Sequence, residues 1–234
     1  SKINFTANNS KFDANGIQFV INPYDEFGLT KAMMLKEKTA GNVMVITVGD
    51  ASVEPVMRKA LAIGADSAIR INAKPTDSYF TANAISTYLK ENPADLIIAG
   101  RESIDYNGGA VSGMIAEMMN LPFVNACNGL EIDGNTAKLS REIDGGKENL
   151  SANLPLVIGG QKGLVEESDL RIPNMRGIMQ ARSKPLTVVE PFSDESLTSS
   201  ENFEKPAEKS ACKLVEAGNE AELVSLLLSE AKVI

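Results

Sequence analysis

Histidine and tryptophan are absent from this sequence of 234 residues, and aromatic residues make up only 5% of it. Without histidine, the chain lacks the usual general base, the commonest metal ligand and every Ser-His-Asp triad. The two cysteines, Cys127 and Cys212, are too few for a disulfide framework, which favours a reducing compartment such as the bacterial cytoplasm. We therefore expect a chain that holds a cofactor, with no catalytic residue and no metal ligand.

Positive charge and long apolar runs are also scarce. The formal net charge is -8, which argues against nucleic acid or an anionic membrane as the main partner. No uninterrupted apolar run approaches the length of a membrane-spanning helix, and residues 1–16 lack a secretory signal pattern. We expect neither nucleic-acid binding nor membrane insertion.

Strand-like and helix-like segments alternate through the first half of the chain. Strands are indicated over 42–50, 66–72, 94–100 and 121–127, and helices over 23–39, 53–65, 76–92 and 110–120. Ser52, and either Thr76 or Asp77, are the expected N-caps of two of these helices. The alternation predicts a mostly parallel sheet with helices on both faces, and the runs VMVITV and LIIA are expected to be buried on both sides.

The second half of the chain has a different pattern of apolar and polar residues. Residues 129–160 alternate apolar and polar residues around Asp133-Gly134-Asn135, which predicts an antiparallel hairpin. Residues 193–210 are polar, as in a linker or extended arm, and 219–234 form an amphipathic helix with a stripe of Leu223, Leu226, Leu227 and Ala231. We divide the chain into an α/β domain, 1–192, and a C-terminal arm with its helix, 193–234.

The segment GRESIDYNGGAVSGM (100–114) follows a strand and opens a helix, which is the arrangement of many phosphate-binding loops. Gly108, Gly109 and Gly113 would allow a phosphate to approach the backbone, and ligands in such sheets bind at the carboxyl ends of strands. The spacing matches neither common glycine fingerprint. The alternative is a tight turn in which Asp105 or Asn107 caps the helix, and the loop alone does not decide between the two.

Five segments in the same order resemble the beta subunit of electron-transfer flavoproteins. The most specific is REIDGGKENLSANLPLVIGG (141–160). The other four are NPYDEFGLTKA (22–32), ALAIGAD (60–66), GRESIDYNGG (100–109) and DLRIPNMRGIMQARSKPLTVVEP (169–191). The resemblance covers nearly the whole chain.

The resemblance implies a Rossmann-like domain of the adenine-nucleotide-alpha-hydrolase type. It also implies a heterodimer with an alpha subunit, which carries the redox-active FAD. Electrons would arrive from acyl-CoA or other dehydrogenases and leave to a quinone reductase or another acceptor. Members of this family usually begin with a further β-strand and a short turn before the segment that corresponds to residues 1–5, so we expect that a first strand is missing from this sequence.

By the same resemblance, an AMP that takes no part in the redox chemistry occupies the beta subunit, and in bifurcating members a second FAD takes its place. Carried over position by position, the pocket comprises Asn22, Pro23, Tyr24, Asp25, Val48, Glu102, Ser103, Ile104, Asp105, Tyr106, Asn107, Gly108, Gly109, Ala110, Val111, Ser112 and Gly113. Tyr106, Asn107 and Ala110 replace the Gly, Asp and Gln that are typical of bifurcating members, which favours AMP.

Two further regions are implied to contact partners. A recognition loop at 165–184 places Met175 where the family inserts an aliphatic anchor into a dehydrogenase, and Arg176, Arg182 and Lys184 form a basic patch around it. The alternatives are that Met175 packs under the loop and that the cations line a solvated helix face. Arg141, Asp144 and Glu148 would lie near the alpha subunit, although Asp144-Gly145-Gly146 is also a good turn.

One competing class is a stand-alone adenine-nucleotide-binding protein of the stress-protein type, which would need no partner. An ATP-using ligase of the same superfamily would need a glycine-rich phosphate motif near the start, and the sequence shows none.

Overall fold

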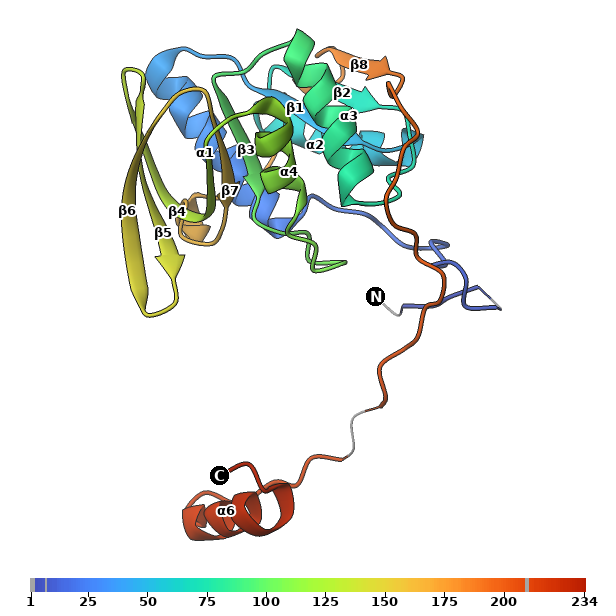
Figure 1. Cartoon of the computed structure of the whole chain (residues 1–234), viewed down its shortest axis with the longest axis vertical. Helices are drawn as coiled ribbons and strands as arrows, with labels where there is room; N and C mark the ends of the chain where they lie inside the picture. The colour runs from blue at the N-terminus through green and yellow to red at the C-terminus, as the bar shows by residue number, and fades with distance from the viewer. Residues whose placement is uncertain (1–2, 7, 209–210) are drawn as a thin grey trace. The chain divides into compact units, whose positions relative to one another are not determined.

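The computed structural model describes residues 3–6, 8–208 and 211–234, and it consists of two compact units (Figure 1). The larger unit spans residues 14–199, and the smaller one combines residues 1–13 with 200–234. The boundary that we expect from composition, at 192/193, lies slightly before this division.

The larger unit alternates helices and strands as the sequence predicts. Its first half comprises α1 (Pro23–Thr39), β1 (Met44–Val48), α2 (Glu54–Ile63), β2 (Ser67–Ile71), α3 (Ser78–Glu91), β3 (Leu96–Gly100) and α4 (Val111–Met119). Its second half comprises β4 (Phe123–Asp133), β5 (Thr136–Ile143), β6 (Gly146–Asn153), β7 (Leu156–Gly160), α5 (Met175–Ala181) and β8 (Leu186–Val189).

The described strands form two sheets. The first is parallel, in the order β1-β2-β8, and the second has the order β3-β7-β4-β5-β6. In the second sheet β3, β7 and β4 run parallel, whereas β4, β5 and β6 are antiparallel, so the predicted mostly parallel α/β fold with a hairpin element is confirmed. Positive φ angles at Gly134 and Gly145 make the two hairpin turns, because glycine adopts this conformation without steric cost.

Helices cover both faces of the second sheet. Successive side chains of β7 point to opposite faces of the sheet, and each face packs against different helices. Leu156 and Ile158 pack in one apolar cluster with Phe27 of α1. Val157, between them, packs in another cluster with Ile85 of α3 and Ile115 of α4. Helix α1 therefore lies on one face of the sheet, and α3 and α4 lie on the other (Figure 1).

The expectation that the runs VMVITV and LIIA are buried on both sides is wrong. Strands β1 and β3, which contain them, are only half-buried along their whole length, whereas β7 is buried throughout. The reason is their position, because β1 and β3 each pair along one edge only in the described part of the chain. Side chains from both strands nevertheless join a single apolar cluster that includes Ile71 and Val157.

Aspartate side chains begin two of the helices. Asp77 caps α3 as predicted, since its Oδ1 accepts a hydrogen bond from the N–H of Phe80 at 2.7 Å. The prediction of Ser52 as a cap is wrong: Asp50 accepts from the N–H of Ser52, and a 3-10 turn over Ala51–Val53 precedes α2. The side chain of Asp50 reaches this amide from two residues upstream, as in an Asx turn.

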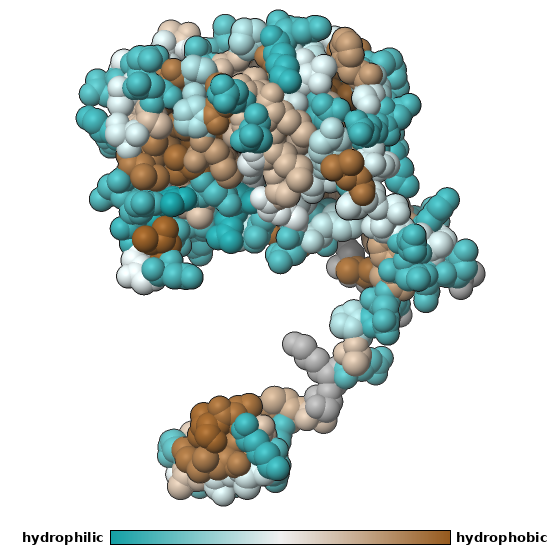
Figure 2. Space-filling model, in the orientation of Figure 1, coloured by the Kyte–Doolittle hydropathy of each residue, from teal (hydrophilic) through white to brown (hydrophobic). Residues whose placement is uncertain are grey.

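In the smaller unit, aromatic and backbone contacts join the N-terminal segment to the chain around Phe203. The rings of Phe5 and Phe203 stack with centroids 5.2 Å apart, and the N–H of Phe203 donates to the carbonyl of Asn9 at 2.9 Å. The predicted C-terminal helix forms as α6 (Glu220–Leu226), which continues into a π-helical turn over Leu227–Ala231. Apolar side chains gather on its surface (Figure 2).

No described helix is long and apolar enough to cross a membrane.

Asp77 also holds the start of the C-terminal arm. Its Oδ2 accepts hydrogen bonds from the N–H groups of Leu197 and Thr198 at 2.7 and 2.8 Å. Replacing Asp77 with Ala should lower the free energy of unfolding by about 1 kcal/mol through loss of the cap, and should speed proteolysis near residue 197. Urea denaturation and limited proteolysis measure the two effects, with Ser196→Ala as the control. Equal cleavage rates in the two variants would contradict the anchoring role.

Candidate functional site

The first turn of α1 and the carboxyl end of β3 meet at the predicted nucleotide site. Asp25 Oδ1 accepts a hydrogen bond from the N–H of Gly100 at 2.7 Å. Asn22 Nδ2 donates to Asp25 Oδ2 and to the carbonyl oxygen of Glu102, both at 2.8 Å. A Cβ at Gly100 would come within 2.9 Å of Asn22 Nδ2 and of Tyr24 Cβ, so only glycine fits between the helix and the strand end.

Asp25 is a partly buried carboxyl group. Burial raises its pKa above the ordinary value of 3.8, and the hydrogen bonds from Asn22 and Gly100 partly offset that effect. A buried carboxylate requires such donors, because an unpaired charge is costly in the interior. The pair Asn22 and Asp25 therefore ties the start of α1 to the loop after β3.

The loop after β3 is closed on itself. Ser103 and Gly108 exchange two backbone hydrogen bonds, and Asp105 Oδ1 accepts from the N–H of Tyr106 and from the hydroxyl of Ser103. Ile104 and Tyr106 are exposed at 59% and 72%. Asp105 is therefore used inside the loop, and neither it nor Asn107 caps α4.

Helix α4 begins without a side-chain cap, and Ala110 stands at its N-cap position. The Oγ of the buried Ser112 has no hydrogen-bond partner in the part of the chain that the structure describes. A Cβ at Gly108 would meet open space, so no protein contact demands a glycine there. These three features leave the N-terminus of α4 able to accept an anionic group.

The remaining predicted pocket residues lie on α1, at the end of β1, in this loop and at the start of α4. Pro23 is in the first turn of α1, and the side chains of Val48 and Val111 pack against the same apolar cluster. Gly109 lies close to the carbonyl of Arg101, and Gly113 lies against the ring of Phe123.

Two polar residues near the site are not found by the sequence reasoning. Arg101 lies over the ring of Tyr24, 5.9 Å from its centroid, and its Nη1 donates to Gln161 Oε1 at 2.8 Å. Gln161, which is buried, in turn donates from Nε2 to Glu142 Oε2 at 2.9 Å. Arg101 and Gln161 directly follow β3 and β7. Because ligands in such sheets bind at the carboxyl ends of strands, these positions in the sequence could have indicated both residues.

The predicted subunit-interface residues lie on the β5-β6 hairpin. Arg141 and Glu148 are directly opposite each other and form an ion pair, with 2.5 Å between Nε and Oε2. Asp144 is exposed in the turn between the two strands. Their contact with another subunit stays a prediction.

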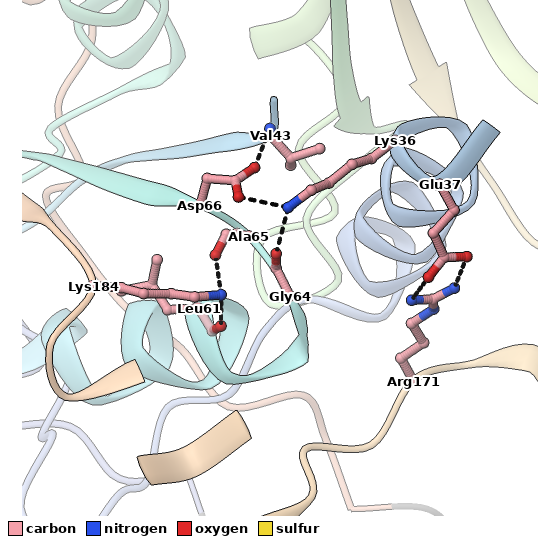
Figure 3. A network of polar contacts seen from close by, with 9 residues as sticks. All are labelled: Lys36, Glu37, Val43, Leu61, Gly64, Ala65, Asp66, Arg171 and Lys184. Atoms are coloured by element: carbon pink, nitrogen blue, oxygen red, sulfur yellow. Dashed lines mark hydrogen bonds and ion pairs between the residues drawn. The ribbon is translucent and has the colours of Figure 1, made fainter. Parts of the chain in front are cut away.

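Residues 171–184 of the recognition loop, called the recognition segment from here on, are fixed at both ends (Figure 3). At the start of this segment, Arg171 donates from Nη1 and Nη2 to the two carboxylate oxygens of Glu37 on α1, both at 2.7 Å. At its end, Lys184 Nζ donates to the carbonyls of Leu61 and Ala65 at the C-terminal end of α2, at 2.9 and 2.6 Å. Lys184 thus has a structural role, and its predicted part in docking stays a prediction.

A second ammonium group supports the same end of α2 (Figure 3). Lys36 Nζ donates to the carbonyl of Gly64 at 3.3 Å and to Asp66 Oδ1 at 2.5 Å. Asp66 Oδ2 accepts from the N–H of Val43. Burial pushes the pKa of Asp66 up, but the hydrogen bonds from Lys36 and Val43 outweigh this effect, and the pKa lies below its ordinary value of 3.8.

Between its two anchors the segment presents apolar side chains to solvent. Ile172, Met175 and Met179 are 87%, 75% and 68% exposed. The side chain of Asn174 accepts from the N–H of Gly177 at 2.8 Å and so begins α5 at Met175. Met175 does not pack under the loop, and Arg176 and Arg182 are exposed on the same short helix and its end.

Within the described residues, no group of His, Cys, Asp and Glu side chains is arranged to hold a metal ion.

Comparisons with known proteins identify the family of this chain. Residues 10–193 match the electron transfer flavoprotein domain family. The electron transfer flavoprotein subunit beta of Bacillus subtilis is 37% identical, over 96% of this chain and 91% of that protein.

The chain belongs to the electron transfer flavoprotein beta-subunit family. The subunit beta of Syntrophomonas wolfei is 34% identical over 92% of this chain and 84% of that relative. The human subunit beta is 29% identical over 76% of this chain and 71% of that relative. The resemblance drawn from the five sequence segments is therefore confirmed.

The lowered pKa of Asp66 predicts a pH-dependent loss of stability. Because the folded pKa lies below 3.8, Asp66 contributes stability above that value and loses it as the pH falls through the folded pKa. Asp66→Asn should lower the free energy of unfolding at neutral pH and converge with the wild type in acid. Urea denaturation across this range measures the difference, with the exposed Asp194→Asn as control. A difference that does not depend on pH would contradict the assignment.

Proposed function

We propose that this chain is the beta subunit of a cytoplasmic, heterodimeric electron transfer flavoprotein. Its alpha partner carries the redox-active FAD, which accepts electrons from dehydrogenases such as acyl-CoA dehydrogenases and passes them to a quinone reductase or another acceptor. The family membership carries this proposal, together with the anion-accepting N-terminus of α4 beside the fixed start of α1. The chain positions cofactors and partners and supplies no acid, base or nucleophile.

The beta subunit would hold AMP at the carboxyl ends of β1 and β3. The open space at Gly108, the unpartnered hydroxyl of Ser112 and the uncapped start of α4 fit a phosphate group. Asn22 and Asp25 hold the loop rather than the nucleotide, since their side chains already bond to the loop backbone and to each other. AMP itself supplies no redox chemistry and acts as a structural ligand.

The alpha subunit would bind the surfaces that this chain leaves open. Helix α6 exposes Leu223 and Val224, and the π-helical turn after it exposes Leu228. These exposed apolar side chains favour a chain that buries its C-terminal helix against a partner over a stand-alone nucleotide-binding protein. The β5-β6 hairpin, with Arg141, Asp144 and Glu148, would form a second contact with the alpha subunit.

The nucleotide content of the purified heterodimer tests the pocket. Denaturation should release about one FAD and one AMP per heterodimer, because the beta pocket holds a nucleotide without flavin. Chromatography of the released nucleotides gives the count. Release of two FAD and no AMP would indicate a bifurcating protein, and a complex with neither AMP nor a second FAD would contradict the pocket.

Met175 is the proposed anchor for a dehydrogenase. Met175→Ala should slow flavin reduction by an acyl-CoA dehydrogenase about tenfold, because truncating a central apolar anchor removes well over 1 kcal/mol of binding. The FAD and AMP contents should not change. Stopped-flow reduction measures the rate, with Leu197→Ala as a matched control at an exposed leucine. An unchanged rate for Met175→Ala rejects the anchor.

A further inference from the structure

A groove of about 520 Å³ lies between α2 and α5, outside the nucleotide site. Apolar side chains form much of its lining, and basic side chains complete the wall. The apolar residues are Ala62, Pro173, Ile178 and Ala181, and the basic ones are Arg58, Lys59 and Arg182. A volume of this size lies within the range of pockets that bind small ligands or large side chains.

The walls of the groove are fixed by close backbone packing. A Cβ at Gly177 would lie 2.3 Å from the carbonyl oxygen of Ala62, so α5 rests directly on α2 at this glycine. Arg58 Nη1 donates to the carbonyls of Ala181 and Lys184 at 2.7 and 2.8 Å and joins the end of α5 to α2. The groove is therefore preformed on two packed helices, which lowers the entropic cost of binding.

The charge of the groove lining is opposite in sign to the net charge of the chain. Three cations line the groove, and among the described lining residues none is acidic, although the net charge of the chain is -8. Lys59 pairs with Glu26 at 2.6 Å, and Arg58 is directed at backbone carbonyls. Arg182 is exposed and has no ion pair within the part of the chain that the structure describes. Its guanidinium is available to a carboxylate of a partner.

The groove is continuous with the proposed docking surface. Ile178 lines the groove and lies on the same helix as Met175 and Met179, and Pro173 follows the exposed Ile172. A partner that covers Met175 would therefore also cover the groove. An apolar side chain flanked by carboxylates matches the apolar floor and the basic rim.

We propose that docking is reciprocal: while Met175 enters the dehydrogenase, the α2–α5 groove receives an apolar side chain from an acidic segment of that dehydrogenase. The inference rests on the proposed function, since it assumes that the dehydrogenase binds at the recognition segment. It adds a receiving site on this chain, with Ala62 and Ile178 as its floor and Arg182 as the contact for a carboxylate.

The test uses the heterodimer with its alpha subunit and a purified acyl-CoA dehydrogenase. Ala62→Leu fills the groove, and Arg182→Glu reverses the free charge at its rim. Each should raise the KM for the flavoprotein about tenfold with little change in kcat, because each removes binding without touching the flavin. Arg182→Glu should also weaken the dependence of the rate on ionic strength. Lys90→Glu, the same charge change on the exposed end of α3, is the matched control.

Each outcome decides the question. If the wild type is reduced and the KM of both variants stays within about twofold, the inference fails and the proposed function stands. An equal effect of Lys90→Glu would show a non-specific charge effect and would also overturn it. If the dehydrogenase does not reduce the wild type, the proposed function fails and the inference with it. If Ala62→Leu loses FAD or unfolds, the KM of Arg182→Glu and the dependence of its rate on ionic strength decide the question.

Discussion

The structure of the candidate site depends on one partly buried carboxylate. Asp25 accepts the N–H of Gly100 and the side-chain amide of Asn22, and Asn22 reaches on to the carbonyl of Glu102. A buried carboxylate must keep its donors, so the first turn of α1 cannot move away from the end of β3 without a large cost. The conformation of the loop that follows β3, and with it the start of α4, is set by this requirement. Glycine at position 100 makes this contact possible, because any larger side chain would collide with the first turn of α1.

The basic residues around the recognition segment divide into two groups. Lys36, Arg58, Arg171 and Lys184 all donate to carbonyls or carboxylates of the chain itself, and so they hold α1, α2 and the segment together. Arg182 is exposed at the end of α5 and makes no ion pair within the described residues. The first group keeps the surface rigid, and residues such as Arg182 are left to interact with another molecule. A rigid surface loses little conformational entropy when a partner binds.

The sequence predicted what local patterns control. Periodicity located α1 to α4, and Gly134 and Gly145 located the hairpin turns. The family motifs point to a nucleotide site and a recognition segment, and the roles of both stay predictions. The sequence could not predict contacts between distant residues. The internal use of Lys184 depends on carbonyls of α2, more than a hundred positions away, and the relay from Arg101 through Gln161 joins separate strands. Likewise, the apolar content of β1 and β3 does not reveal that each strand pairs along one edge only.

The exposed methionines also make the docking surface chemically sensitive. Thioethers at Met175 and Met179 are open to solvent, whereas that of Met33 is buried against Gly64. Oxidation to the sulfoxide turns a flexible apolar side chain into a polar one and disrupts methionine-rich interfaces, and reductases reverse it. An oxidant would therefore modify the proposed docking surface of this chain before its core. Partner binding would weaken while the fold and the nucleotide site stayed intact, and reduction of the two sulfoxides would restore it.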